Sequence, residues 1–515
     1  MAWDKELEEL KRRSALAEKM GGDEKLKRQA DRGKLNVRER LLRLVDKESF
    51  REIGKLSGRA AYNDDGSLKD FMAANFLFGR ANVEGRPIVA TGDDFTVRGG
   101  AADAAIWQKM VAAEQMAHEL RLPLVRMIDG TGGGGSVKTL NTSARTYVPA
   151  NPGWDWVVRN MATVPVVALG LGPVAGLGAA RLVTSHFSVM VKALTQVFVA
   201  GPPVVKRLGE DVDKEGLGGA HIHAHNGVVD AVAESEDEAI EMARRFLTYL
   251  PSSVDGLPPR TETTDDPNRE DEALVSVVPE DRRKVYKMRK IINSVVDQDS
   301  FFEMGKLWGR SAITGFARLD GWPVAVLAND PYHYGGGWTA DAAQKIVRFI
   351  DLAETFHLPV VHLVDNPGFV IGIEAERAGT IRHGCRALAA VYQASVPWCS
   401  ILIRKAFGVA GAANLNHSRF HYRFAWPSGD WGSLPLEGGI EAAYQSELEQ
   451  AEDPDALRAE IESAMNEVRS PFRTAEAFLV EDIIDPRKTR SLLCEFAELA
   501  APLRKAGPVS FPIRP

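Results

Sequence analysis

The sequence has 515 residues, of which 45% are hydrophobic and 26% are charged, so it holds enough apolar residues for large cores and is long enough for two to four domains. Its net charge is −7 and it has no long basic run interleaved with aromatic residues, which argues against a nucleic-acid-binding protein. Cys385, Cys399 and Cys494 are too widely spaced for a disulfide framework or a CxxC metal pair. No run of about 18 uncharged apolar residues or signal-peptide pattern occurs, so we expect a reduced, soluble, cytoplasmic protein.

Residues 1–47 are charged and helical in pattern, and we expect them to form an N-terminal helical segment. Leu7, Leu10 and Leu16 give this segment its apolar spacing, which favours a solvated helix that packs on a partner subunit. A short amphipathic helix is predicted within residues 32–50, and its apolar positions are Leu41, Leu42 and Leu44.

The rest of the chain is a tandem duplication. SFREIGKL at 49–56 is repeated as SFFEMGKL at 300–307, and VEGRPIVATGDDFTVRGG at 83–100 aligns with LDGWPVAVLANDPYHYGG at 319–336. The second alignment also matches Gln108-Lys109 with Gln344-Lys345, Leu122-Pro123 with Leu358-Pro359, and Asp129 with Asp365. Each copy predicts two strands, a Gly-Gly loop, a helix, a strand ending in Asp, a helix, a strand and a glycine-containing turn. This alternation indicates an α/β fold built of βαβ units.

One strand–turn–helix stretch in each copy has glycines at the start of the helix. Val164 to Ala180 ends in Gly176-Leu177-Gly178, and Val396 to Ala412 aligns Gly408-Val409-Ala410 with that turn. First-turn amides of a helix have no intrahelical acceptor and carry the positive end of the helix dipole, so they can hold an oxyanion. Close packing of strand on helix would also explain small residues at one such turn. Their repetition favours a role in ligand binding.

The best domain boundary is the segment 251–267, which is rich in Pro, Asp and Thr and has no apolar periodicity. We therefore expect an N-terminal domain at 48–255, a linker at 256–280 that acts as a solvated connector, and a C-terminal domain at 281–515.

Several motifs resemble one known family. They are RGKLNVRERL (32–41), DDFTVRGGA (93–101), AGPPVVK (200–206), GEDVDKEGLGGAHIH (209–223), DNPGF (365–369), IRHG (381–384), RKAFG (404–408) and AWP (425–427). With them the chain, from about Arg32 to its end, resembles the carboxyltransferase (β) subunits of biotin-dependent acyl-CoA carboxylases, such as the propionyl-CoA and methylcrotonoyl-CoA enzymes, and the related decarboxylases. The resemblance implies two tandem crotonase-like (ClpP/crotonase) domains, the first on the acyl-CoA side and the second on the biotin side. It also implies an active site between domains of different subunits in a homohexamer, a dimer of trimers.

The resemblance assigns roles to particular residues. Gly176 and Leu177 would stabilise the acyl thioester oxyanion, and Val409 and Ala410 the ureido oxygen of biotin. The remaining implied residues are Gly99, Gly100, Gly132, Gly133 and Ala412 for substrate, and Gly368, Phe369 and Gly408 for biotin. Leu177 and Val409 stand where the family has glycine, and the loop 130–140 lacks the family's Arg and acidic residue.

The implied reaction moves a carboxyl group from N1'-carboxybiotin to the α-carbon of an acyl-CoA. It needs no metal and no protein general base. No biotinylation site or ATP-binding loop is present in the sequence, so a separate biotin carrier and a separate biotin carboxylase are the expected partners. A decarboxylase subunit of the sodium-pump type and a non-catalytic scaffold remain as alternatives. Asp129 and Asp365, at corresponding strand ends, are expected to cap the next segment or to orient the loops, and capping is favoured. If His221, His223 and His225 lie on a strand, they share one face and could bind a metal, although the resemblance implies no metal site in this segment.

Overall fold

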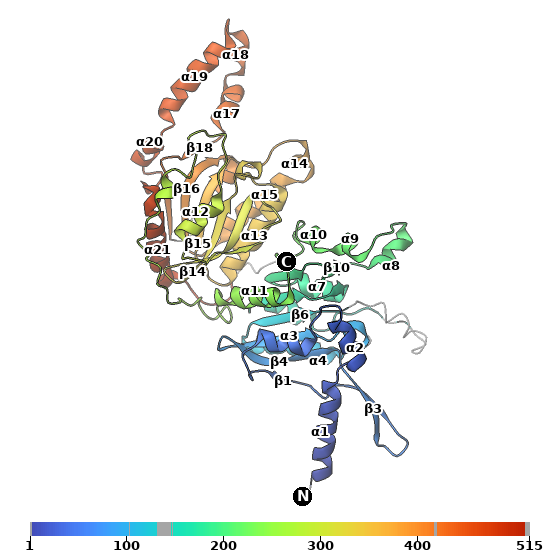
Figure 1. Ribbon diagram of the computed structural model, residues 1–515. Helices are drawn as coiled ribbons and strands as arrows, with labels where there is room; N and C mark the ends of the chain where they lie inside the picture. The colour runs from blue at the N-terminus through green and yellow to red at the C-terminus, as the bar shows by residue number, and fades with distance from the viewer. Residues whose placement is uncertain (1–2, 102–103, 131–145, 147, 417–419, 510–515) are drawn as a thin grey trace. The chain divides into compact units, whose positions relative to one another are not determined.

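The computed structural model describes residues 3–101, 104–130, 146, 148–416 and 420–509, without the side chains of Glu437 and Glu467 (Figure 1). The chain divides into two compact units, residues 1–256 and residues 257–511. Among the described residues, no helix is long and apolar enough to cross a membrane.

The first unit is built on a seven-stranded sheet of order β1-β4-β5-β6-β7-β9-β11. The pairs β1–β4 and β4–β5 are antiparallel, and every later pair in the sheet is parallel. Two small sheets, β2-β3 and β8-β10, lie outside it. The strands are β1 (Arg51–Glu52), β2 (Gly58–Tyr62), β3 (Leu68–Ala73), β4 (Phe76–Val83), β5 (Arg86–Asp93), β6 (Leu124–Ile128), β7 (Val166–Gly170), β8 (Pro173–Ala175), β9 (Phe187–Val191), β10 (Gln196–Phe198) and β11 (Ala231–Ala233).

The second unit repeats this sheet strand for strand, in the order β12-β13-β14-β15-β16-β17-β19, with β18 paired to β16. Its first two pairs are again antiparallel and the rest are parallel. The predicted α/β fold with two tandem copies is therefore confirmed. The strands are β12 (Phe302–Met304), β13 (Ala312–Leu319), β14 (Trp322–Asn329), β15 (Val360–Asn366), β16 (Trp398–Phe407), β17 (His421–Ala425), β18 (Asp430–Gly432) and β19 (Asp482–Ile483).

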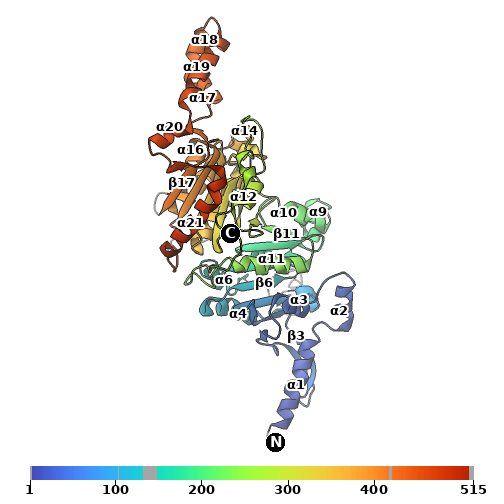
Figure 2. The same ribbon diagram turned by 60° about the vertical axis from the view of Figure 1, so that its left-hand side comes forward.

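Helices connect the strands within each unit (Figures 1 and 2). Those of the first unit are α1 (Asp4–Glu18), α2 (Asp23–Ala30), α3 (Val37–Leu44), η1 (Arg98–Gly100), α4 (Trp107–Leu120), α6 (Trp154–Met161), α7 (Leu177–Val183), α8 (Pro202–Val205), η3 (Lys206–Leu208), α9 (Lys214–Gly218), α10 (Ala220–His223) and α11 (Glu236–Thr248). Those of the second unit are η4 (Glu272–Val275), α12 (Met288–Val295), η5 (Tyr334–Gly336), α13 (Ala340–Thr355), α14 (Ile373–Arg377), α15 (Thr380–Gln393), α16 (Gly408–Ala412), α17 (Leu436–Ala443), α18 (Gln445–Gln450), α19 (Pro454–Val468), α20 (Pro471–Glu476), η6 (Pro486–Lys488), α21 (Thr489–Ala500) and η7 (Ala501–Leu503).

The central strands of each sheet are buried throughout. All five residues of β6 and all seven of β15 are buried. Parallel strands covered on both faces need apolar residues at successive positions, which explains why these segments show continuous apolar runs instead of alternation. The sheets thus hold on rigid supports the carboxyl ends of β7 and β16, the strands that lead toward the two predicted turns.

The short helix α3 begins at a capping box. The side chain of Asn36 accepts from the amides of Arg38 and Glu39, and the Glu39 carboxylate accepts from the amide of Asn36. Leu41 and Leu44 are buried as predicted, but Leu42 points to solvent. Val37 is also buried, and the fourth buried position on that face is the charged Arg40, which the apolar pattern did not reveal.

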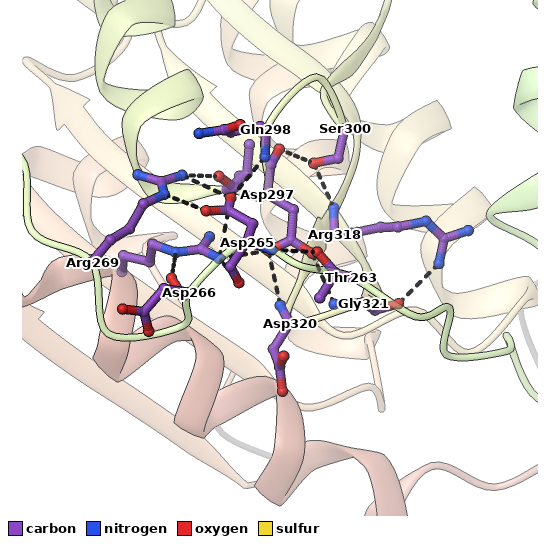
Figure 3. Close-up of polar contacts among 12 residues, drawn as sticks. Thr263, Asp265, Asp266, Arg269, Asp297, Gln298, Ser300, Arg318, Asp320 and Gly321 are labelled. Carbon is purple, nitrogen blue, oxygen red and sulfur yellow. Dashed lines mark hydrogen bonds and ion pairs between the residues drawn. The ribbon is translucent and has the colours of Figure 1, made fainter.

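Residues 257–270, expected within a solvated connector, are tied by polar contacts to the second unit (Figure 3). The Asp265 carboxylate accepts from Arg269 Nε at 2.7 Å and from the amide of Gln298 at 2.9 Å. The buried Arg490 of α21 donates to Asp297 at 2.9 Å and to the carbonyls of Asp265 and Asp266. Because the buried Arg490 guanidinium donates hydrogen bonds to backbone carbonyls of this segment, the segment is a fixed part of the second unit's surface.

Candidate active site

The first predicted turn lies between β8 and α7. Gly176 precedes the helix with φ of 59° and ψ of −123°, a conformation that L side chains rarely adopt. Its amide donates to the carbonyl of Phe198 at 3.3 Å. The next two amides, those of Leu177 and Gly178, have no acceptor among the residues that the structure describes. The first turn thus presents the amides of Leu177 and Gly178 without a described acceptor, whereas the amide of Gly176, which was predicted as a donor, is used within the chain.

The second turn joins β16 to α16 and has the same form. Gly408 has φ of 61°, and the amides of Val409 and Ala410 find no acceptor within the described part of the chain. The Val409 side chain is 53% exposed, while Ala410 is buried. Alignment of the two copies matches Val409-Ala410 with Leu177-Gly178, so the two turns present equivalent pairs of amides.

The Gly-Gly loops form a second pair of matching turns. Gly99 and Gly100 have φ of 64° and 66°, and Gly335 and Gly336 have φ of 62° and 91°. A Cβ on Gly100 would lie 2.6 Å from the carbonyl oxygen of Asp129, and one on Gly336 would lie 2.1 Å from that of Asp365. Glycine is therefore required here for close backbone packing against the ends of β6 and β15.

Asp129 is the centre of a buried ionic cluster in the first unit. Its carboxylate accepts from Lys34 Nζ at 2.7 and 2.9 Å and from Arg40 Nη1 at 2.8 Å. Arg40 also bonds Glu236 at 2.5 Å and donates to the carbonyl of Leu171, at the end of β7. Burial lowers the pKa of Lys34, an effect that the adjacent Asp129 opposes. The cluster links the segment 34–40 to the carboxyl ends of two central strands.

Asp365 occupies the equivalent place in the second unit. It accepts from Tyr286 Oη at 2.8 Å, from Arg404 Nη2 at 3.0 Å and from the amide of Lys405 at 3.1 Å. Burial, together with the nearby Asp365 charge, raises the pKa of Tyr286 well above its usual value. The described partners of the Asp365 carboxylate come from other segments of the chain, so the expectation that it caps the segment after it is wrong. The segment after Asp129 lies largely outside the described residues, so the same expectation for Asp129 stays a prediction.

The remaining predicted residues of the second unit lie around its turn. A Cβ on Gly368, where φ is 116°, would be 3.6 Å from the carbonyl oxygen of Phe407, so the segment 367–369 runs beside the start of α16. Phe369 packs on Trp338, with ring centroids 6.1 Å apart, and its ring fills the place where Gly384 lacks a side chain. Ala412 is exposed at the end of α16. Gly132 and Gly133, predicted for substrate, lie outside the described residues.

One cation near the second turn was not predicted as a site residue. The ammonium nitrogen of Lys405 lies 4.0 Å from the position that a Cβ on Gly335 would take. It stands beside the second Gly-Gly loop, three residues before Gly408. Its place in the RKAFG motif was the available sequence signal.

The histidine hypothesis is wrong in its geometry. His221 and His223 lie on the short helix α10, and His225 follows it, so alternate residues do not share a face as they would on a strand. His223 Nε2 contacts the carbonyl oxygen of Val197 at 2.8 Å. Among the residues that the structure describes, no group of three or more His, Cys, Asp or Glu side chains is arranged to hold a metal ion.

Comparison with known proteins agrees with this architecture. The family model of the carboxyl transferase domain matches residues 28–508. The propionyl-CoA carboxylase carboxyltransferase subunit of Haloferax mediterranei is 31% identical over 99% of this chain and 98% of its own. The methylmalonyl-CoA decarboxylase α subunit of Veillonella parvula is 31% identical over 94% of both chains.

A solved structure shows the same fold over nearly the whole chain. Transcarboxylase 12S, crystallised with methylmalonyl-coenzyme A and methylmalonic acid and described as a hexamer, superposes with a TM-score of 0.88 at 30% identity and covers 98% of both chains. These relationships confirm the predicted crotonase-like fold and the predicted carboxyltransferase function. The chain belongs to the carboxyl transferase domain family, as a carboxyltransferase of the biotin-dependent acyl-CoA carboxylases.

Proposed function

We propose that this chain transfers a carboxyl group between biotin and the α-carbon of an acyl-CoA, using one backbone turn for each reactant. The observation that carries the proposal is the repeated pair of helix-start amides, Leu177-Gly178 and Val409-Ala410, that have no acceptor among the described residues. Two reactants that each develop negative charge on an oxygen require two such donors.

The first turn serves the acyl thioester. Loss of the α-proton puts negative charge on the thioester oxygen, and the amides of Leu177 and Gly178 would donate to it, assisted by the positive end of the α7 dipole. Gly178 has no side chain to shield its own amide. Gly99, Gly100, Gly132, Gly133 and Ala412 complete the substrate residues that we assign by resemblance.

The second turn fits the ureido oxygen of biotin. Val409 and Ala410 would donate to that oxygen, and Gly368, Phe369 and Gly408 would border the ring. Carboxybiotin bound there would supply the carboxyl group and a basic ring nitrogen, so this chain's own residues would not need to provide a general base. Lys405 lies beside this turn, where its ammonium would attract the anionic carboxyl group. The chain's own part is to orient the two reactants and to stabilise two oxyanions.

Carboxylation is the direction that we propose, with a separate biotin carboxylase and a biotin carrier as partners, in a cytoplasmic homohexamer built as a dimer of trimers. The Haloferax mediterranei relative is named for carboxylation. The Veillonella parvula relative is named for the reverse reaction, and it supports a decarboxylase subunit as the second candidate. The protein that copurifies with the chain separates the two: an ATP-dependent biotin carboxylase supports carboxylation, and a multispanning membrane subunit supports decarboxylation.

Activity of the purified chain is the direct test. It is incubated with free biotin and a panel of malonyl-type CoA thioesters, and the CoA ester that has lost carboxyl is measured. A carboxyltransferase decarboxylates at least one thioester, and only when biotin is present. Failure to turn over any member of the panel would favour the scaffold alternative, in which Leu177 and Val409 obstruct both turns.

A further inference from the structure

An acidic helical arm projects from the second unit. We define the acidic arm as residues 436–468, which form α17, α18 and α19; in both views it extends away from the sheet (Figures 1 and 2). Its helices pack mainly on one another, and Arg458 of α19 bonds Glu441 of α17 at 2.9 Å. The fifteen residues of α19 span about 22 Å at the usual helical rise, so the arm presents a long surface to solvent.

The charge of the arm differs from that of the rest of the chain. The arm contains ten acidic residues and a single basic residue, Arg458, which gives a charge of −9. Since the whole chain carries −7, the remainder carries +2. The arm therefore accounts for the negative charge of the protein and concentrates it on one projecting element.

Apolar side chains are exposed where the arm joins the unit. Phe478 is 78% exposed, and the other large apolar side chains exposed there are Leu434, Val468, Phe472 and Leu479. Both ends of a helical hairpin return to its foot, so these residues belong to one region. Exposed apolar side chains beside a charged surface are typical of a protein interface, in which charge guides the approach and apolar contact stabilises the complex.

A surface of opposite charge lies on the same unit. We define the basic segment as residues 282–290, which contain six cations and no acidic residue. Arg283 is 92% exposed, and the other exposed cations are Arg282, Lys284, Lys287 and Lys290. Val285 is exposed among them. The basic segment thus offers cations and an apolar side chain together, which complements the arm and its foot.

The basic segment begins at the foot of the arm. Arg282 Nη1 bonds Asp430 of β18 at 3.1 Å, and Arg469, the residue after the arm, bonds the same carboxylate at 2.5 and 2.7 Å. A two-fold axis near this foot would lay the arm of each copy along the basic segment of the other. Such an exchange is self-complementary, as a closed dimer interface requires.

We propose that the acidic arm of one copy docks on the basic segment of a second copy of this chain. The proposal goes beyond the reaction, and its test reads the mass of the assembly instead of turnover. Loss of catalysis and loss of this contact can therefore be told apart.

A charge-swap experiment tests the contact. The arm variant carries Glu447→Lys, Glu449→Lys, Glu460→Lys and Glu462→Lys. The segment variant carries Arg283→Glu, Lys284→Glu, Lys287→Glu and Lys290→Glu. All eight residues are exposed, and none of them caps a helix with its side chain or pairs with Arg458. Assembly mass is measured by light scattering on size exclusion and by sedimentation, and circular dichroism verifies folding.

Two paired copies make two arm-to-segment contacts, and each variant alone places like charges at both of them. Its association therefore weakens by about 100-fold or more, and the mass of the assembly falls by half. An equimolar mixture restores opposite charges at both contacts, and the wild-type mass returns as a 1:1 complex of differently tagged chains. Raising salt from about 0.05 to 0.5 M weakens wild-type association in the same way, and this measurement needs no variant.

The matched control carries Lys47→Glu, Lys69→Glu, Arg80→Glu and Lys192→Glu, four exposed cations of the first unit. It keeps the wild-type mass if the basic segment is the docking surface. The proposal would be overturned if either charge-swap variant alone kept the wild-type mass. It would also be overturned if a mixture of the two folded variants failed to regain that mass. A loss of mass in the first-unit control alone would assign the arm to a different surface and would equally overturn the proposal.

Discussion

The two units keep the same buried aspartate but neutralise it differently. Asp129 is paired with Lys34 and Arg40, which precede the sheet, whereas Asp365 is paired with Arg404 of β16 and the hydroxyl of Tyr286. Alignment of the copies matches Arg404-Lys405 with Gly172-Pro173.

This difference has a physical cause. Pro173 has no amide hydrogen and Gly172 has no side chain, so the first unit lacks both donors that Arg404 and Lys405 provide in the second. A Cβ on Gly172 would lie 2.6 Å from Lys34 Nζ, which shows that the Lys34 ammonium occupies the vacated space. Both units have a carboxylate at this strand end, but its counter-charge comes from a different segment in each unit. What the fold requires is a neutralised acceptor in this place, since an unpaired buried charge is costly.

Removal of Arg404 gives the largest expected effect. Arg404→Met leaves Asp365 without a bonded cation and lowers the free energy of unfolding by about 3–5 kcal/mol. Lys34→Met leaves Arg40 on Asp129 and costs about 1–2 kcal/mol, because the buried charge stays paired. Urea unfolding of the two variants measures the difference. Equal losses of stability in the two variants would contradict the idea that two cations neutralise Asp129 whereas one cation neutralises Asp365.

Replacing a glycine of either Gly-Gly loop by alanine gives the next largest expected loss of stability. Gly336→Ala and Gly100→Ala place a Cβ within 2.1 and 2.6 Å of a backbone carbonyl oxygen and also force a positive φ on alanine, so each costs about 2–4 kcal/mol. Gly66, with φ of 81°, has no atom within 4 Å of its Cβ position, so Gly66→Ala costs only about 1 kcal/mol. Thermal unfolding of all three variants separates the two causes, because Gly66→Ala reports the backbone strain alone and the other two variants report the strain plus the clash. A Gly336→Ala loss no greater than that of the Gly66 control would show that the loop can move away from β15.

The aligned lysines Lys109 and Lys345 have different surroundings. Lys345 Nζ donates to the carbonyls of Gly305, Trp308 and Ala312, whereas burial lowers the pKa of Lys109 to about 8, although Glu52 opposes this shift. Folded Lys109 therefore releases its proton below the unfolded pKa of about 10.4, and the unfolded state binds more protons between these values. Stability consequently rises with pH across that window, by on the order of 2 kcal/mol.

Lys109→Met removes this rise and is neutral or stabilising near pH 7. Lys345→Met removes the donor to three backbone carbonyl groups and lowers the free energy of unfolding at the same pH by about 2 kcal/mol. Urea unfolding at pH 7, 8.5 and 10 compares each variant with the wild type. Parallel stability profiles for wild type and Lys109→Met between pH 8 and 10 would refute the assignment.

Ala412 gives the smallest effect. It is exposed at the end of α16, and the aligned Ala180 of α7 is half-buried. Ala412→Asp should shift acyl-chain preference toward short chains by about tenfold, the size typical for a change of one small group in an apolar pocket. The ratio of kcat/KM for short and long acyl-CoA measures the shift, with Ala412→Ser as the control. An unchanged chain-length profile would remove Ala412 from the substrate pocket.

The repeated local features could be predicted from sequence. Apolar runs ending in Asp129 and Asp365 revealed the central strands, and the aligned glycine turns revealed both helix starts, because each depends on a short stretch of chain. The buried ionic clusters could not be predicted in the same way. Lys34, Arg40, Asp129 and Glu236 are brought together only by the sheet order.

Some of the missed features left a sequence signal. Arg40 falls on the same helical face as Val37, Leu41 and Leu44, and a charged residue at an apolar position indicates a buried ion pair. The segment 257–270 has the composition of a linker, yet Arg490, more than 200 positions later, fixes it to the second unit. Composition describes a segment's own preference, and a distant buried cation can override it.

Proline at the two turns tests the central claim most directly. Leu177→Pro and Val409→Pro each delete one amide in the first turn of a helix, where proline is tolerated, while Leu177→Ala and Val409→Ala keep the amide. In the biotin-dependent decarboxylation assay, each proline variant should lose about 100- to 1000-fold in kcat, and each alanine variant should stay within a few fold of wild type. Proline variants that fold and turn over as fast as their alanine controls would contradict the account.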